Sequence, residues 1–248
     1  MSRVDQWDKG FILHSRPFRE TSLIAEIFTC QHGRVSVLFR GVKSASGRNQ
    51  KARILQPFQA LSVLWFGDKE LKTGNKFEAD GAGYFFTGAV LYSAMYLNEL
   101  LLRLLFKEDS HPELFSRYEA TLQQLHAVQL SDQMDSRQLE LVLRMFEWYL
   151  LAALGYELVL DKDAHYADIQ PELYYRYDHD AGFVATGKAM DPAFKQQQFV
   201  GRDLLAMANG KWDQQGALPT AKRLMRMALA PHLGDKPLQS RQLFKQPE

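Results

Sequence analysis

The chain has 248 residues, of which 46% are hydrophobic, so it is long enough for one large or two ordinary domains and can bury a full core. Its single cysteine, Cys30, excludes an internal disulfide and any zinc site built from several thiolates of this chain. The amino terminus lacks the apolar core of a signal peptide and no long run is free of polar residues, so we expect a cytoplasmic, nucleoid-associated protein with no membrane partner.

The formal net charge of +1 conceals an uneven distribution of charge along the chain. Residues 1–82 carry thirteen Lys or Arg against eight Asp or Glu, a net charge of +5. Residues 83–218 carry eleven against nineteen, a net charge of −8, and residues 219–248 carry six against two, a net charge of +4. A basic front, an acidic middle and a basic tail indicate that contact with a polyanion is confined to particular faces.

The first predicted domain consists of β-strands, because the hydrophobic pattern between residues 10 and 80 has a period of two. Breaks at Arg16-Pro17, at 31–33, in a long basic loop and at 67–69 separate five expected strands, at 11–14, 22–29, 34–40, 58–66 and 70–79. Five short antiparallel strands match a small closed barrel. The OB-fold is the common barrel of this size that binds single strands, and an SH3-like barrel is the alternative.

The basic loop after the third strand is the candidate DNA-binding segment. From residue 27 to residue 67 the chain has no carboxylate and six cationic side chains: Arg34, Arg40, Lys43, Arg48, Lys51 and Arg53. Residues 41–51 have too few apolar groups to bury themselves, which predicts a mobile loop. Cations that meet phosphates release counterions, so we expect these six residues, with Lys72 as a neighbour, to bind DNA. A solvated surface loop that is basic but binds no nucleic acid has the same pattern.

Two aromatic residues, Phe39 and Phe58, border this loop. An exposed ring there would stack on bases at about 1–3 kcal/mol each. Both residues lie in strand patterns, however, which favours burial in the barrel core over stacking.

From residue 88 the hydrophobic period becomes helical, so we place a domain boundary near residue 82. We expect helices at 89–106, from Pro112 to Val128, and at 137–154. The third helix follows the capping sequence Asp135-Ser136-Arg137-Gln138, stops at Gly155 and is apolar almost all round. It is therefore predicted to be the buried spine of a helical domain.

The rest of the helical domain is less regular. Residues 156–200 contain no cysteine, and two strand-like runs at 173–177 and 183–186 flank a polar turn, which predicts a β-hairpin. Helices are expected again at 201–208 and 219–229. The second of these carries Lys222, Arg223 and Arg226 on one side, which is either a solvated face or a second DNA-binding patch. The predicted fold is α+β and multidomain: an OB-fold barrel at 1–82, then a mainly α-helical domain at 83–248 with a small hairpin insertion.

Enzymatic function has little support in the sequence. The one dense group of possible hard-metal ligands is Asp161, Asp163, His165 and Asp168, so a metal-dependent nuclease is the alternative function. Their spacing matches no ligand motif, and a polar turn explains them equally well. The sequence has no phosphate-binding Gly-Lys-Ser/Thr loop. We therefore predict no enzyme, no metal and no cofactor.

The whole chain resembles the bacterial recombination mediator RecO. The resemblance depends on the order and spacing of several short segments, among them His14-Ser15-Arg16-Pro17, Gly33-Arg34-Val35, Leu154-Gly155-Tyr156 and Ala221-Lys222-Arg223-Leu224-Met225-Arg226. It implies a protein that binds single- and double-stranded DNA, anneals complementary strands and loads recombinase onto strands coated by single-strand-binding protein, with RecR as a partner. We expect a monomer. A generic OB-fold RNA or DNA binder is a further alternative. The chain departs from those relatives that carry a four-cysteine zinc module after the long helix.

The resemblance also implies a site for a protein tail. In RecO relatives the acidic, aromatic-ended tail of single-strand-binding protein inserts beside the long helix, where the family's arginine aligns with Arg144, between Leu143 and Glu147. A guanidinium beside an apolar pocket suits such a tail. From the residues alone, Glu140, Arg144 and Glu147 form surface ion pairs of little net value. We expect Arg144→Ala to abolish tail binding with little change in thermal stability.

Overall fold

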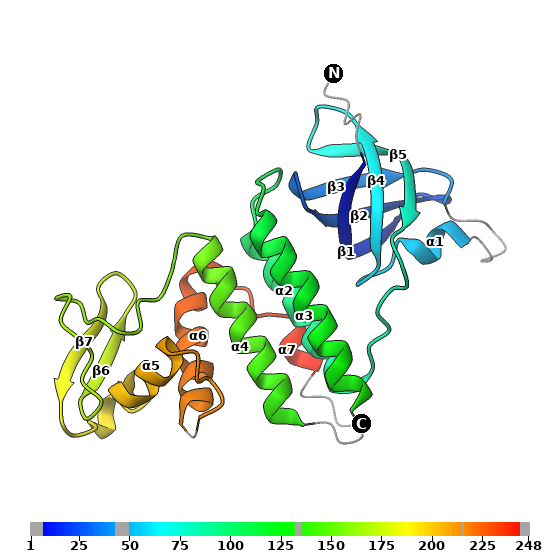
Figure 1. Ribbon diagram of the computed structural model, residues 1–248. Helices are drawn as coiled ribbons and strands as arrows, with labels where there is room; N and C mark the ends of the chain where they lie inside the picture. The colour runs from blue at the N-terminus through cyan, green and yellow to red at the C-terminus, as the bar shows by residue number, and fades with distance from the viewer. Residues whose placement is uncertain (1–6, 43–49, 132–134, 215, 244–248) are drawn as a thin grey trace. The chain divides into compact units, whose positions relative to one another are not determined.

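The computed structural model describes residues 7–42, 50–131, 135–214 and 216–243 (Figure 1). The chain forms two compact units, one of residues 1–134 with 237–248 and the other of residues 135–236. The first unit contains a barrel of five strands: β1 (Asp8–Phe18), β2 (Ser22–Thr29), β3 (Gly33–Phe39), β4 (Ala60–Phe66) and β5 (Leu71–Ala79). It also contains the helices α1 (Gln50–Ile54), α2 (Gly88–Leu104), α3 (Pro112–Leu130) and α7 (Ser240–Leu243).

The barrel is closed in the order β1-β2-β3-β5-β4, and β4 pairs back with β1. Every pair is antiparallel except β3 with β5, which is parallel. Alternate residues point inward, so that Ile27, Val35, Val37, Leu61 and Val63 pack together in the interior. The predicted OB-fold barrel is confirmed.

The first strand is longer than expected, because β1 continues through Arg16 and Pro17, where a break was predicted. Pro17 pairs with Leu23 of β2. On its other side β1 pairs with β4 only from Asp8 to Phe11, so Pro17 lies where that edge of the strand is open. A proline that lacks an N–H is tolerated there.

Helices α2 and α3 cover part of the outer surface of the barrel. The ring of Phe115 on α3 lies 5.7 Å from that of Phe11 and 5.5 Å from that of Phe28, measured between centroids. On α2, Asn98 donates a hydrogen bond of 2.8 Å to the carbonyl of Leu13. Strands β2 and β3 are consequently buried on both faces along most of their length.

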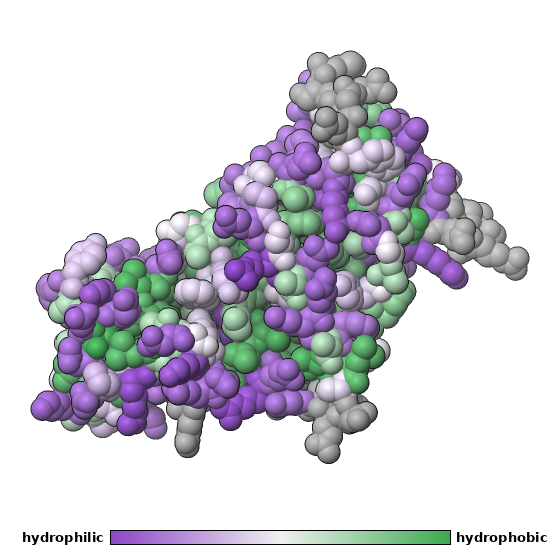
Figure 2. Space-filling model, viewed as in Figure 1, coloured by the Kyte–Doolittle hydropathy of each residue, from purple (hydrophilic) through white to green (hydrophobic). Residues whose placement is uncertain are grey.

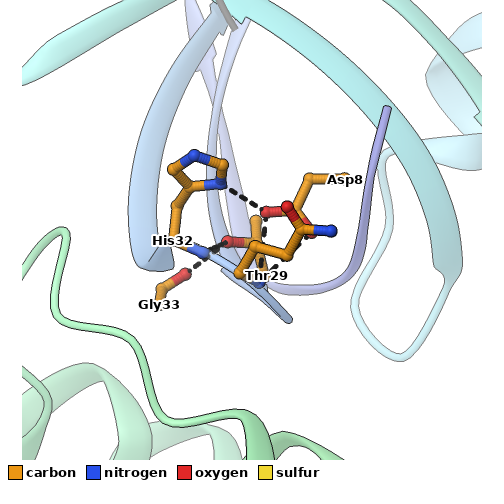
Figure 3. A network of polar contacts seen from close by, with 5 residues as sticks. Asp8, Thr29, His32 and Gly33 are labelled. Atoms are coloured by element: carbon orange, nitrogen blue, oxygen red, sulfur yellow. Dashed lines mark hydrogen bonds and ion pairs between the residues drawn. The ribbon is translucent and has the colours of Figure 1, made fainter. Parts of the chain in front are cut away.

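The turn between β2 and β3 is fixed by polar contacts with β1 (Figure 3). The buried Asp8 carboxylate accepts the N–H of Gln31 at 3.3 Å and lies 2.7 Å from Nδ1 of His32. Thr29 donates its hydroxyl to the carbonyl of Gly33 at 2.9 Å. Gly33 has φ +65°, and a Cβ there would lie 1.7 Å from the carbonyl oxygen of Asp109, so this position requires glycine.

The second unit packs helices beside a small sheet. Its elements are α4 (Ser136–Ala153), β6 (Tyr174–Asp178), β7 (Gly182–Gly187), the 3₁₀ turn η1 (Pro192–Phe194), β8 (Gln198–Val200), α5 (Gly201–Ala208) and α6 (Ala217–Leu233). The predicted hairpin is β6–β7, and β8 adds a third antiparallel strand on the free side of β6. Asp135 caps α4 as expected, by accepting the N–H of Arg137 at 2.8 Å.

The surface of the second unit is partly apolar. Figure 2 shows hydrophobic residues, in green, over the part that contains β6 and β7, among hydrophilic residues in purple. No helix within the described ranges combines the length and the apolar character needed to cross a membrane.

Candidate nucleic-acid interface

One end of the barrel carries a shallow, cationic hollow. It is formed by the turn between β1 and β2, the end of β3 and the start of β5, and it is lined by Phe18, Arg19, Glu20, Thr21, Ser22, Leu38, Arg40 and Leu71. Arg19 and Arg40 are exposed, and the guanidinium of Arg19 lies 5.3 Å from the centroid of the Phe18 ring. OB-folds bind nucleic acid through the loops between strands 1 and 2 and between strands 4 and 5, so the hollow is in the expected place.

Arg19 was not among the residues nominated from the sequence. The signal was present, since a cation beside an aromatic residue follows the expected break at Arg16-Pro17. The later loop carries more cations and therefore gives the stronger signal in the sequence.

The six nominated loop cations are only partly described. Lys43 and Arg48 lie outside the described residues. Lys51 and Arg53 are exposed on α1, a short helix within the segment expected to be a loop. Arg40 and Arg53 make no ion pair with any other described residue, so both are available to a phosphate.

Arg34 is held by its own strand pair. Its side chain is 17% exposed, and Nη1 lies 3.7 Å from Oε2 of Glu26, which also accepts the hydroxyl of Ser36 through Oε1 at 2.6 Å. The Nε atom of Arg34 is buried without a hydrogen-bond partner among the described residues. A phosphate at Arg34 must therefore displace Glu26, which makes Arg34 a weaker candidate than Arg40.

Lys72 does not present a free cation, contrary to expectation. Its side chain is 6% exposed, and Nζ lies 2.8 Å from Oε1 of Glu108. The N–H of Glu108 binds the carbonyl of Arg34 at 2.9 Å, which places the segment after α2 against β3. The charge of Lys72 is thus paired with a carboxylate that is 49% exposed, which makes Lys72 a weaker candidate than Arg40, and its part in DNA binding stays a prediction.

The two nominated aromatic residues belong to the core. Phe39 is 2% exposed and Phe58 is 4% exposed, which agrees with the expectation of burial. Neither ring is accessible for stacking on a base.

The three cations predicted to bind DNA on α6 also differ in whether they are paired within the fold. Lys222 pairs with Glu140 at 3.0 Å. Arg223 donates to the carbonyl of Lys195 at 2.7 Å and lies 4.9 Å from the centroid of the Phe199 ring, and burial lowers the pKa of its guanidinium. Arg226 is exposed and forms no ion pair with another described residue. Of the three, Arg226 is the one best placed to meet a phosphate.

The three residues predicted to bind the protein tail are buried residues of α4. Leu143 is buried, and Nη2 of Arg144 lies 2.9 Å from Oε1 of Glu147, with side chains that are 10% and 0% exposed. The Nε atom of Arg144 is buried without an acceptor among the described residues. The expected surface ion pairs are therefore wrong for Arg144. Its burial also contradicts the expectation that Arg144→Ala leaves stability unchanged, since breaking a buried pair costs about 3–5 kcal/mol.

The acidic cluster at 161–168 forms a turn. Oδ1 of Asp163 accepts the N–H groups of His165 at 2.8 Å and Ala167 at 3.0 Å, and Asp168 pairs with Lys162 at 2.5 Å. Within the described ranges, no three His, Cys, Asp or Glu side chains are grouped to hold a metal ion. The geometry gives the nuclease alternative no support.

Comparison with known proteins places the chain in one family over nearly its full length. The family model described as "Recombination protein O N terminal" matches residues 1–80, and "Recombination protein O C terminal" matches residues 86–242. The chain is 44% identical over 236 residues to "DNA repair protein RecO" of Pseudomonas paraeruginosa, which covers 94% of this chain and 92% of that relative. The same protein of Stutzerimonas stutzeri is 44% identical over 95% and 92%, and that of Serratia proteamaculans is 40% identical over 98% and 95%.

Proposed function

Because the chain belongs to the RecO family of DNA repair proteins, we propose that it is a recombination mediator that binds single- and double-stranded DNA and anneals complementary strands. It helps to load recombinase onto strands coated by single-strand-binding protein, without catalytic turnover and with RecR as a protein partner. Residues 1–82 are the proposed DNA-binding domain.

The cationic end of the barrel is the observation that carries this proposal. Helices α2 and α3 and the segment after α2 cover much of the outer face of β2 and β3, so the proposed site is an end of the barrel and not that face. There Arg19 and Arg40 are exposed beside one lining carboxylate, Glu20, among the described residues. Contacts of this kind are made to phosphates and read no sequence, as annealing of any complementary pair requires.

The salt dependence of DNA binding tests the proposal. Each phosphate contact contributes about 0.7 to the slope of log K against log salt for single strands and about 0.9 for duplex. The triple variant Arg19→Ala, Arg40→Ala, Arg53→Ala is expected to flatten the single-strand slope by about 2 and to weaken binding equally on unrelated sequences. Lys188→Ala, which removes an exposed cation of the second unit, is the matched control.

The slope separates this interface from a general loss of charge. A triple variant with the wild-type slope removes the barrel end from the DNA site. A control that flattens the slope as much as one of the three cations would show that any surface cation contributes.

We also propose that the acidic tail of single-strand-binding protein binds beside α4 at Leu143, Arg144 and Glu147. The orphaned Nε donor of Arg144 supports this assignment, because a buried donor without an acceptor is one hydrogen bond short of satisfaction. A carboxylate of the tail supplies such an acceptor. The apolar residues that surround the pair on α4 suit an aromatic side chain.

A further inference from the structure

An exposed aromatic ring lies next to α1, outside every strand. Phe85 is 80% exposed in the segment between β5 and α2. Phe39 and Phe58 are buried, whereas Phe85 is exposed near Arg53 of α1, and cations alone do not distinguish single strands from duplex.

Phe85 lines a hollow of about 230 Å³ whose walls are aromatic and uncharged except for one cation. The rings of Phe58 and Phe86 meet edge to face at 5.2 Å between centroids, and Tyr84 stacks parallel to Phe86 at 5.7 Å. Arg53 of α1 contributes the cation, and the remaining described lining residues include no carboxylate: Gln56, Pro57, Gln59, Gly83, Leu91 and Met95. Such a site favours a flat, apolar-faced group attached to an anion.

The backbone that carries Phe85 is fixed while its ring remains in solvent. Gln129 of α3 donates to the carbonyl of Phe85 at 2.9 Å and accepts the N–H of Thr87 at 2.8 Å. Close packing holds the neighbouring segment, since a Cβ on Gly83 would lie 2.4 Å from Oε1 of Gln59. Phe58, which also lines the hollow, has a left-handed backbone with φ +67°, a strained conformation that is common at ligand-binding sites. The backbone at Phe85 thus has little conformational freedom to lose on binding.

We infer that Phe85 is a stacking platform for one unpaired base of single-stranded DNA, with Arg53 binding an adjacent phosphate. This inference rests on the proposed DNA-binding function. Charge favours DNA over a protein as the occupant, because the hollow is continuous with α1, whose charged residues are Lys51 and Arg53, in a stretch of sequence that has no carboxylate from residue 27 to 67. The exposed amide of Gln56 offers donors and an acceptor to any base edge, whereas Nε2 of Gln59 already donates to the carbonyls of Ala60 and Gly81. A duplex keeps its bases paired and cannot use the platform.

Replacement of Phe85 tests the inference, with Phe106→Ala as the matched control. Phe106 is 75% exposed in the same unit and does not line the hollow. Phe85→Ala is expected to weaken binding of an unstructured oligothymidine about 5- to 150-fold with an unchanged salt slope, and to change duplex affinity less than about 2-fold. Phe85→Trp is expected to retain single-strand affinity. In a strand that contains 2-aminopurine, wild type and Phe85→Trp quench the fluorescence and Phe85→Ala does not.

Each other outcome overturns the inference. If Phe85→Ala binds single strands as tightly as Phe106→Ala does, Phe85 is not a stacking platform. The same conclusion follows if Phe85→Ala loses equal affinity for single strands and for duplex. If Phe85→Ala impairs binding of a protein partner and leaves oligothymidine binding intact, the hollow is a protein-docking site. A wild-type protein that binds no DNA contradicts the proposed function itself, which distinguishes that failure from a failure at Phe85 alone.

Discussion

Removal of Arg144 from α4 is expected to destabilise the protein strongly, because its partner is more deeply buried than Arg144 itself. The side chain of Glu147 has no exposed surface, and its Oε1 lies 2.9 Å from Nη2 of Arg144. In Arg144→Met the carboxylate stays in the interior without its guanidinium. Breaking a buried ion pair on one side lowers the free energy of unfolding by about 3–5 kcal/mol, most of which is the cost of the uncompensated charge.

The double variant Arg144→Met, Glu147→Leu separates this charge from packing. Both charges are then replaced by apolar side chains of similar length, a change that is often close to neutral. We expect the double variant to recover at least about 2 kcal/mol of what Arg144→Met loses. Lys222→Ala is the control on the same helix pair, because it breaks the exposed contact with Glu140 and is expected to cost at most about 1 kcal/mol.

Urea unfolding followed by circular dichroism measures these differences, with the slopes compared between variants to detect a change of mechanism. The same double variant tests the proposed tail site: it remains folded, lacks the guanidinium and is expected to lose affinity for an acidic, aromatic-ended peptide. A loss below about 1 kcal/mol in Arg144→Met would refute the reasoning from burial. Wild-type peptide affinity in the double variant would remove Arg144 from the tail site.

Two further predictions concern contacts between distant parts of the first unit. Burial tends to raise the pKa of the Glu99 carboxyl, but hydrogen bonds from Ser240 and the Gln239 N–H outweigh it and lower the pKa below its usual 4.5. The contacts of Glu99 with α7 therefore stabilise the fold at neutral pH and are lost as the pH falls below 4.5. Hydrogen exchange of α7 is expected to be faster in Glu99→Gln than in wild type at pH 7. A difference in exchange rate that did not shrink toward pH 4 would contradict this expectation. Gly33→Ala is expected to lower the free energy of unfolding by about 1–3 kcal/mol or more, because Cβ meets the carbonyl of Asp109 and φ is positive; an unchanged urea midpoint would show that the turn relaxes freely.

The barrel could be predicted from the sequence because its signal is local. Alternation with a period of two identified all five strands, and the change of period located the first helix at residue 88 to within one residue. The exceptions have local causes as well. Pro17 continues β1 because the neighbouring edge is open, and β8 has three residues, too few to show a period.

The burial and pairing of the candidate site residues could not be predicted, because they depend on how the fold packs around each residue. Lys72 is neutralised by Glu108, and only the fold brings the segment after α2 back to β3. The residues of α4 alone predicted surface ion pairs for Arg144 and Glu147, although the same helix was expected to be a buried spine. Arg144 and Glu147 do pair with each other, but they do so in the buried interior of the unit.

The inferred platform at Phe85 bears on how an annealing protein can release its product. The phosphate contacts proposed for Arg19, Arg40 and Arg53 would serve single strands and duplex alike, so they would hold both reactants and product. A base on Phe85 is bound only while it is unpaired. When the complementary strand arrives, the base leaves the ring for its partner, and the stacking contribution of about 1–3 kcal/mol is lost from the complex with the duplex but not from the complex with a single strand. In the proposed mechanism the platform therefore weakens binding of the product relative to the reactants, by a margin that the Phe85→Ala variant is expected to abolish.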